Sequence, residues 1–120
     1  MRRVAALLLW GLIGTAQATR MMMLGEKIHG EEAERIGLIY KCVEDESLES
    51  EATALVQRLA NGPTVALGQM KRTLREGLQA DFPATLAAEA NAQRIAGSTQ
   101  DAVEGAMAFL QKRKAEFRGS

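Results

Sequence analysis

The chain has 120 residues, of which 47% are hydrophobic and only 4% are aromatic. Its 15 basic and 15 acidic residues cancel to zero net charge, so no global field attracts nucleic acid or an anionic membrane. The length suits one modest domain or part of one, and the abundance of alanine, leucine and methionine favours helix over strand.

The first 18 residues imitate a secretory signal peptide. Arg2 and Arg3 precede the apolar run VAALLLWGLIG, which is followed by the small residues TAQA. The run is too short to span a bilayer, which requires about 20 apolar residues. Two other interpretations stay open: residues 9–18 begin the first amphipathic helix, or residues 1–11 are an atypical leader left by a truncated or shifted reading frame. We expect a cytoplasmic protein.

In the next segment, two glycines mark predicted helix ends. Residues 15–24 are compatible with a helix, and Gly25 suits the position after its end, where a positive φ is needed. Residues 31–36 predict a short helix with acidic residues first, which Gly37 ends. The apolar run at 38–43 has β-branched and aromatic members, so it predicts a short strand without a partner in this chain.

The remaining chain is predicted to be helical. Apolar residues at helical spacing predict a first helix from Leu48 to Leu59, which ends at the sequence NGP. The second helix is expected to have two faces. Its core face is predicted to carry Val65, Ala66, Met70, Leu74 and Leu78, and its solvent face Lys71, Arg72 and Arg75. Pro83 opens a third helix, which stops at Gly97.

The last helix has a cap signal before it. Ser98 offers an N-cap, and Asp101 stands three residues later in a position like that of a capping box. The helix itself contains Val103, Met107 and Leu110.

Chemistry-bearing side chains are few and scattered. His29 is the only histidine, so it lacks a second histidine for a zinc site, and we expect it to cap a helix or be exposed. Glu31, Glu32 and Glu34 form the densest carboxylate cluster and are expected to be solvated. Cys42 can form neither an internal disulfide nor a CxxC site and is expected to be a small buried residue. One or two of the three consecutive methionines are expected in the core.

The C-terminal end combines an aromatic side chain with basic residues. The sequence places Phe109 and the basic run Lys112, Arg113 and Lys114 on the predicted final helix. A cation and an aromatic ring one turn apart can hold an anionic group by charge and an adenine by stacking. In the alternative, the basic residues complement the negative end of the helix dipole while Phe109 packs in the core. Physical chemistry leaves both interpretations open.

Three stretches are specific enough to compare with known families. They are GEKIHGEEAERIGLIYKCV, the helix pair around NGP, and STQDAVEGAMAFLQKRKAEF with its Phe-x-x-Lys-Arg-Lys pattern. Together they resemble the C-terminal part of the enoyl-CoA hydratase/isomerase, or crotonase, family over residues 12–120. The resemblance implies a mainly α fold, a small orthogonal helical bundle like the C-terminal domain of the crotonase fold, with one short unpaired strand and no ββα spiral core.

The resemblance also implies a role in fatty acid metabolism. In that family the region packs trimers together and contributes to the acyl-CoA site, so Phe109 and Lys112 are implied to touch the adenine and phosphate of CoA on a neighbouring subunit. Some hydratases place another aromatic near position 93, where this chain has Gln93. The family's oxyanion hole and catalytic glutamates belong to segments upstream of this sequence. We therefore predict no catalytic residue, no metal site and no activity for the chain alone.

The implied partners are acyl-CoA and either further copies of the chain in a homo-oligomer or a full-length paralogue. No nucleic acid and no membrane span are expected. Two alternatives stay open: a non-enzymatic helical module for oligomerisation or interaction, and an exported small helical protein.

Overall fold

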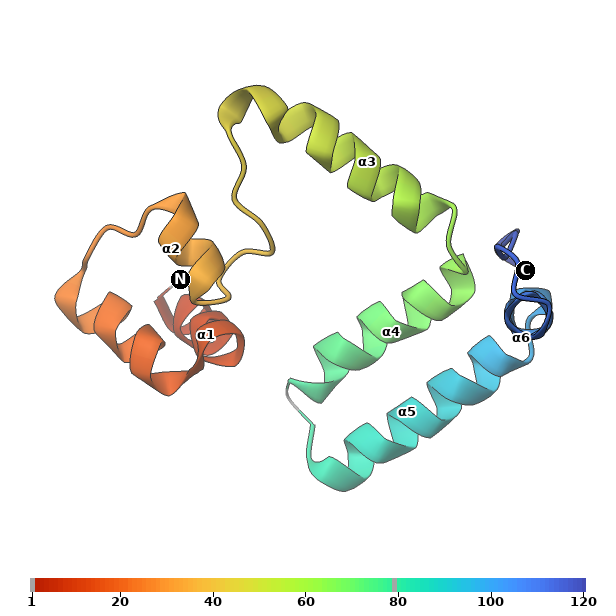
Figure 1. Cartoon of the computed structure of the whole chain (residues 1–120). Coiled ribbons are helices and arrows are strands. Elements are labelled where there is room, and N and C mark those ends of the chain that lie inside the picture. Colours follow the sequence, from red (N-terminus) through yellow and green to blue (C-terminus); the bar gives the residue numbers. More distant parts are fainter. Residues whose placement is uncertain (1, 79) are drawn as a thin grey trace. The chain divides into compact units, whose positions relative to one another are not determined.

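The computed structural model describes the backbone of residues 2–78 and 80–120 and the side chains of residues 9–78 and 80–120. Over these residues the regular structure is entirely helical, which confirms the predicted mainly α class (Figure 1). The elements are α1 (Arg2–Leu24), α2 (Gly30–Arg35), the 3-10 turn η1 (Asp45–Ser47), α3 (Leu48–Ala60), α4 (Thr64–Gly77), α5 (Phe82–Gly97) and α6 (Gln100–Leu110). The chain divides into two compact units, Met1–Leu48 and Glu49–Ser120.

In the first unit, α1 is broken at Gly14. This residue has φ 74° and ψ 167°, values outside the helical region, so a new helical run starts at Thr15. The run ends at Leu24, and Gly25 follows with φ 64°, its amide donating to the carbonyl of Met21 at 3.2 Å. The predicted helix at 15–24 and its glycine stop are confirmed.

The short helix α2 is also confirmed, with a glycine end. Gly37 has φ 78°, its amide donates to Glu34 at 3.0 Å, and the amide of Leu38 donates to Ala33 at 2.8 Å. These two bonds form a Schellman motif, which satisfies helix carbonyls that would otherwise lack donors. The acidic first turn holds Glu31 and Glu32, as the helix dipole favours.

The strand predicted at 38–43 is wrong. Residues 38–40 form a bend and residues 41–44 are irregular. A strand satisfies its amides only by pairing with another strand, and the described residues contain none. Here the amide of Ile39 instead donates to Ala33 at 3.3 Å, and that of Cys42 donates to the carboxylate of Glu34 at 2.7 Å.

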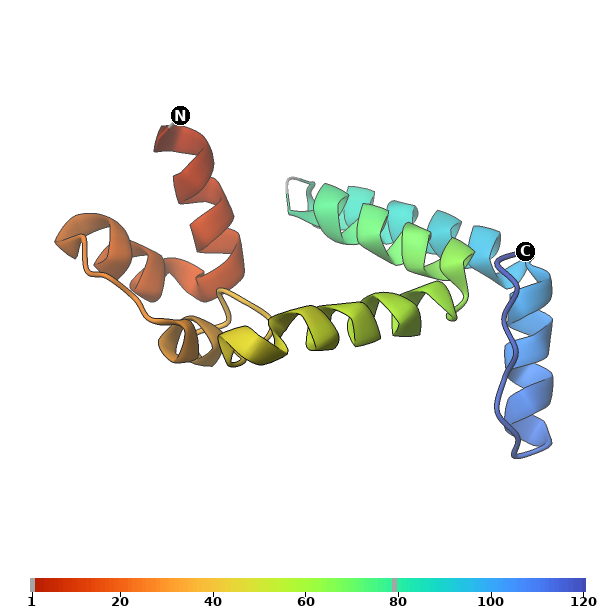
Figure 2. The same ribbon diagram turned by 90° about the horizontal axis from the view of Figure 1, so that it is seen from above.

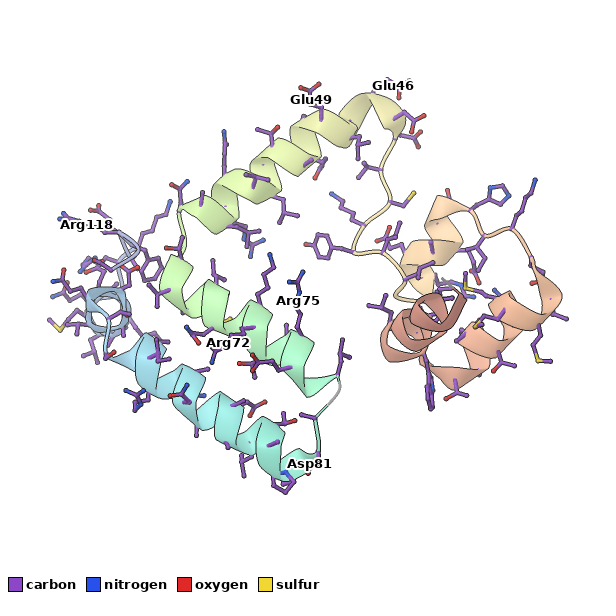
Figure 3. The ribbon with its side chains drawn as sticks, turned by 180° about the vertical axis from the view of Figure 1, so that it is seen from behind. Glu46, Glu49, Arg72, Arg75, Asp81 and Arg118 are labelled. Carbon is purple, nitrogen blue, oxygen red and sulfur yellow. The ribbon has the colours of Figure 1, made fainter. Side chains whose placement is uncertain are left out.

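In the second unit, α4 and α5 lie side by side and antiparallel, and α6 follows at the end of α5 (Figures 1 and 2). The α4–α5 contact uses small residues: a methyl group added at Gly77 would lie 3.5 Å from Thr85. Asp81 caps α5 by accepting from the amide of Ala84 at 2.9 Å (Figure 3). Pro83 lies in the first turn of α5, as predicted.

The cap of α6 differs from the prediction by one residue. Thr99, and not Ser98, is the N-cap, and its hydroxyl accepts from the amide of Ala102 at 3.1 Å. The hydroxyl of Ser98 instead donates to the carbonyl of Ile95 at 2.8 Å, because α5 extends through Gly97. Asp101 does not close a capping box: its carboxylate accepts from two amides near the C-terminus.

The interior of the described chain is very small. Its buried hydrophobic residues are Ala18, Ala33, Ala92 and Ala108, and no large side chain among the described residues is fully buried. The core-facing role predicted for part of α4 is wrong, because Met70, Leu74 and Leu78 are more than half exposed. Helical periodicity creates an apolar face, but only a packing partner can bury it.

The accessible surface agrees with this small interior. It measures 9918 Å², whereas a folded monomer of this mass is expected to expose about 6,300 Å². Even two separately folded units of these lengths would expose only about 7,600 Å². The chain therefore leaves much more surface in water than a self-contained domain of this mass does.

The N-terminal region adds two findings. Met1 and the side chains of residues 1–8, which include Arg2 and Arg3 of the signal-like pattern, lie outside the described part of the chain. Across the residues that are described, no helix has both the length and the apolar character needed to cross a bilayer.

Candidate functional site

The candidate site is the point where the chain reverses after α6. The helix ends at Leu110, and Lys112 takes the left-handed conformation with φ 52°. The amide of Lys112 donates to Phe109 at 3.2 Å and that of Arg113 donates to Ala108 at 3.0 Å, which makes a Schellman motif with lysine in the usual glycine position. The C-terminal tail, residues 111–120, then runs back along α6 (Figure 2).

This reversal corrects the predicted position of the basic cluster. Lys112, Arg113 and Lys114 do not extend the final helix, because they lie beyond its last residue, Leu110. Their basic groups are therefore carried by the turn and the tail. Phe109 and Lys112 were expected one turn apart on a continuous helix. Instead, Lys112 lies beyond the helix end, and its amide donates to the carbonyl of Phe109.

The turn presents both predicted CoA-contact residues to solvent. Phe109 is 83% exposed, so the alternative in which it packs in a core is wrong for this chain. Lys112, three residues later, is also exposed. An aromatic ring can bind a base by stacking, and an ammonium group can bind a phosphate by charge.

Glu104 fastens the beginning of the tail. Its two carboxylate oxygens accept from Nη1 and Nη2 of Arg113 at 2.5 and 2.7 Å, a bidentate ion pair. The same carboxylate accepts from the amide of Glu116 at 2.9 Å. The Arg113 guanidinium, followed by this amide, lowers the pKa of Glu104 from 4.5 to about 2, and Glu104 in turn raises the pKa of Arg113.

Asp101 fastens the end of the tail. It is only 3% exposed, and its carboxylate accepts from the amides of Arg118 at 2.7 Å and Gly119 at 2.8 Å. The backbone amide of Asp101 donates to the carbonyl of Ser120 at 2.9 Å. Figure 3 shows Arg118 in the tail beside α6. We call Asp101, Glu104 and their bonds to the tail the carboxylate latch.

A cleft of about 930 Å³ lies in the same unit, among α4, α5, α6 and the tail. Small and apolar side chains supply much of its lining, together with several amides and hydroxyls. Residues from each of these elements include Met70, Leu74, Thr85, Ala92, Gln93, Ala106 and Phe117. Gln93, which replaces the second aromatic expected by resemblance, therefore lies in the wall of this cleft.

The other candidate residues lie in the first unit. His29 is exposed at the N-cap of α2, where its side chain makes no cap hydrogen bond. Glu32 pairs with Arg35 at 2.6 Å and with Arg20 at 3.2 Å, and the Arg35 guanidinium lowers the pKa of Glu32. No group of three or more potential metal ligands occurs in the described residues.

Cys42 and the methionines differ in part from expectation. Cys42 is only partly buried, and it packs so closely on α2 that a methyl group at Gly30 would lie 2.5 Å from its sulfur. Met21 is partly buried, whereas Met22 and Met23 are exposed. The prediction that one or two methionines pack inward is therefore met by Met21 at most.

Sequence reasoning missed the carboxylate latch. Asp101 was noted only as a possible capping residue, and Glu104 carried no local signal because its partner Arg113 lies nine residues away across a reversal. The positive φ of Lys112 could not be anticipated either, since glycine or asparagine is the usual signal for that conformation. A tertiary contact, and not a motif, creates this site.

The comparisons with known proteins agree on one family. The profile of the enoyl-CoA hydratase/isomerase family matches residues 4–120. The chain is 41% identical over 107 residues to a probable enoyl-CoA hydratase of Rhodobacter capsulatus, covering 89% of this chain and 42% of that protein. It is 36% identical to the crotonyl-CoA hydratase of Syntrophomonas wolfei, covering 88% of this chain and 41% of that protein.

A solved structure gives the same correspondence. The enoyl-CoA hydratase from Bacillus anthracis superposes with a TM-score of 0.84 at 28% identity, covering 97% of this chain and 45% of the other. The chain thus spans less than half the length of these relatives, and the helical fold matches part of the crotonase fold.

Proposed function

Because the chain belongs to the enoyl-CoA hydratase/isomerase family, we propose that it forms the CoA-contacting and subunit-assembling region of a cytoplasmic enzyme acting on acyl-CoA in fatty acid metabolism. The observation that carries the proposal is the exposed Phe109–Lys112 turn within a chain that matches the family over residues 4–120.

In this proposal the turn binds the nucleotide end of CoA. Phe109 is 83% exposed, so its ring face is accessible for an adenine to stack on. Lys112 supplies a compact positive charge for a phosphate. Gln93 offers an amide where some relatives offer an aromatic ring, so stacking on Phe109 carries more of the adenine contact.

The second part of the proposal concerns assembly. The apolar residues Val103, Met107 and Leu110 recur at helical spacing along α6 and are each 45% exposed or more. On α4, Met70 and Leu74 are likewise exposed. Faces of this kind bury their surface against another subunit, so we propose that they contact copies of this chain or a full-length paralogue in a trimer. In that setting the helices are proposed to close into the orthogonal bundle predicted from the sequence.

The 120 residues alone are proposed to be inactive. Hydration of an enoyl thioester requires amide donors for the developing enolate charge and a carboxylate that exchanges a proton with water or carbon. The carboxylates of Asp101 and Glu104 are already occupied by amides and by Arg113. Asp101 and Glu104 are therefore assigned no catalytic role.

A non-enzymatic interaction module is the second candidate. The observation that favours it is the surface of 9918 Å², well above that expected for a folded chain of this mass. In this alternative the same apolar helix faces assemble the chain, and CoA has no role.

Calorimetric titration with CoA separates the two candidates. We expect the chain to bind CoA and Phe109→Ala to weaken binding about tenfold, the usual value for losing one stacked base. Phe82→Ala is the matched control, since Phe82 is 78% exposed at the start of α5 and is expected to leave affinity unchanged. Absence of CoA binding, with a defined oligomer in size-exclusion chromatography, would favour the interaction module.

A hydration assay tests the remaining claim. With crotonyl-CoA as substrate, the chain alone is expected to give the rate of the uncatalysed reaction. Turnover well above that rate would show that an active site exists in these residues.

A further inference from the structure

The turn at Lys112 requires an explanation because a long side chain there is unusual. Its φ of 52° lies in the left-handed region, which residues other than glycine and asparagine seldom adopt. Such a conformation persists only where surrounding contacts fix it. The Schellman bonds from Lys112 and Arg113 fix the backbone at the helix end, but they do not fix the direction in which the chain leaves.

Glu104 fixes that direction. Its carboxylate grips the side chain of Arg113, the residue directly after the turn, through two parallel hydrogen bonds. It also accepts from the backbone of Glu116 three residues later. One carboxylate therefore holds the tail on both sides of Lys114, and a bidentate pair constrains orientation as well as distance.

Asp101 holds the far end of the same segment. Its buried carboxylate binds two successive amides, those of Arg118 and Gly119. Phe117 lies in the tail between the residues that these two carboxylates bind. Its ring packs against α6, where a methyl group at Gly105 would lie 3.6 Å from it. The tail is therefore fixed at its beginning, middle and end, which leaves the turn little freedom.

From this geometry we propose that Glu104 and Asp101 are positioning residues: by latching the tail to α6, they hold the turn that presents Phe109 and Lys112 to CoA. The inference rests on the proposed CoA-contacting function. Neither carboxylate touches the ligand. Each acts through the tail, Glu104 next to the turn and Asp101 from the other end of the helix.

The proposal predicts a graded effect with distance from the turn. Removing the negative charge of Glu104 frees Arg113 and lets Lys112 sample other backbone conformations, so the ordered turn must be regained when CoA binds. Removing that of Asp101 frees the tail end first, while the Glu104–Arg113 pair still holds the turn. Glu104→Gln is therefore expected to weaken CoA binding more than Asp101→Asn.

The experiment measures two properties of the full chain. Amide hydrogen exchange at Glu116 and Arg118 reports whether the tail is latched, and calorimetry reports affinity for CoA and for pantetheine, which lacks the nucleotide and all phosphates of CoA. For Glu104→Gln we expect exchange at Glu116 to accelerate about tenfold and CoA affinity to fall about fivefold. Affinity for pantetheine should not change, because it carries neither the base assigned to Phe109 nor a phosphate for Lys112.

Two further variants complete the design. Arg113→Lys keeps the positive charge but loses the bidentate geometry, so it should fall between the wild-type chain and Glu104→Gln. Glu49→Gln removes an exposed carboxylate in the first turn of α3 and should change neither property. Unchanged helical circular dichroism in all variants separates positioning from unfolding.

The outcomes are distinct. Faster exchange with unchanged CoA affinity in Glu104→Gln would overturn the positioning role while leaving the proposed function intact. Equal losses for CoA and pantetheine would also overturn it, because general destabilisation does not distinguish the two ligands. A wild-type chain that binds no CoA would refute the proposed function, and the positioning role with it.

Discussion

The C-terminal segment from α6 to Ser120 and the helix α3 are both short, yet they differ in their contacts. In the C-terminal segment, Asp101 and Glu104 accept from named amides and a guanidinium, and Ala108 of α6 is 2% exposed. Every residue of α3 is exposed. The first segment is therefore held to α6 by named contacts of buried and partly buried carboxylates, whereas the second has no buried residue.

The difference shows what periodicity alone can achieve. The apolar residues of α3 repeat at helical spacing, with Leu48 59% exposed and Leu59 49% exposed. A helix of 13 residues is marginal in water without packing. Burial of this face would stabilise α3 further, while the C-terminal segment already has the carboxylate latch.

The largest effect is expected from Asp101→Ala. The change leaves the amides of Arg118 and Gly119 without their charged acceptor and should lower the free energy of tail opening by about 3 kcal/mol. Hydrogen exchange at these two amides measures it. Asp45→Ala, in the exposed turn η1, is the control and should leave tail exchange unchanged. If these two amides exchanged at the wild-type rate in Asp101→Ala, Asp101 would not hold the tail, and the contrast with α3 would be lost.

Gly119→Ala should have the next largest effect. Gly119 has φ 77°, and a methyl group there would lie 2.6 Å from Oγ1 of Thr64. Backbone strain and the clash together are expected to cost the tail about 2 kcal/mol in opening free energy. Gly97→Ala is the matched control, because nothing lies within 4 Å of the added methyl and its φ is not positive. If the tail amides exchanged equally fast in Gly119→Ala and Gly97→Ala, the placement of Gly119 beside Thr64 would be contradicted.

Acid should release the tail only at very low pH. The folded-state pKa of Glu104 is lowered from 4.5 to about 2, so its contribution to stability is fully present above about pH 4.5 and is lost as the pH falls toward 2. A pH titration followed by the amide resonance of Glu116 should show this midpoint. The transition should be absent in Glu104→Gln. A midpoint near 4.5 would mean that Arg113 does not pair with Glu104 in solution.

The smallest effect is expected in α3. Leu55→Ala removes an exposed side chain and keeps helix propensity, so the free energy of unfolding should change by less than about 0.5 kcal/mol. Thermal unfolding followed by circular dichroism measures it. In the presence of a full-length paralogue, a larger loss would identify this face as buried on assembly.

Much of the helical outline could be predicted because its signals are local. Gly25 and Gly37 follow helix ends, Gly25 with the positive φ expected of it, and Pro83 lies in the first turn of α5 as predicted. The cap of α6 was misplaced by one residue because Ser98 and Thr99 are both good caps, and the length of α5 decided between them.

The candidate site was predicted by residue but not by geometry. The sequence pattern indicates Phe109 and Lys112, both of which are exposed, and their role with CoA stays a prediction. Their placement on a continuous helix was wrong, because the reversal at Lys112 depends on Glu104 and Arg113 meeting across it. The strand at 38–43 failed for a similar reason, since a strand exists only through its pairing partner.

The sequence by itself determined the family, the positions of most helices and their glycine and proline boundaries, because these depend on residues within one or two turns of each other. Only the tertiary structure decided which apolar faces stay uncovered, where the chain reverses after α6, and that Asp101 and Glu104 bind the tail. Those features arise from groups that meet through space, and their free energy depends on burial and hydrogen-bond geometry that no local pattern encodes.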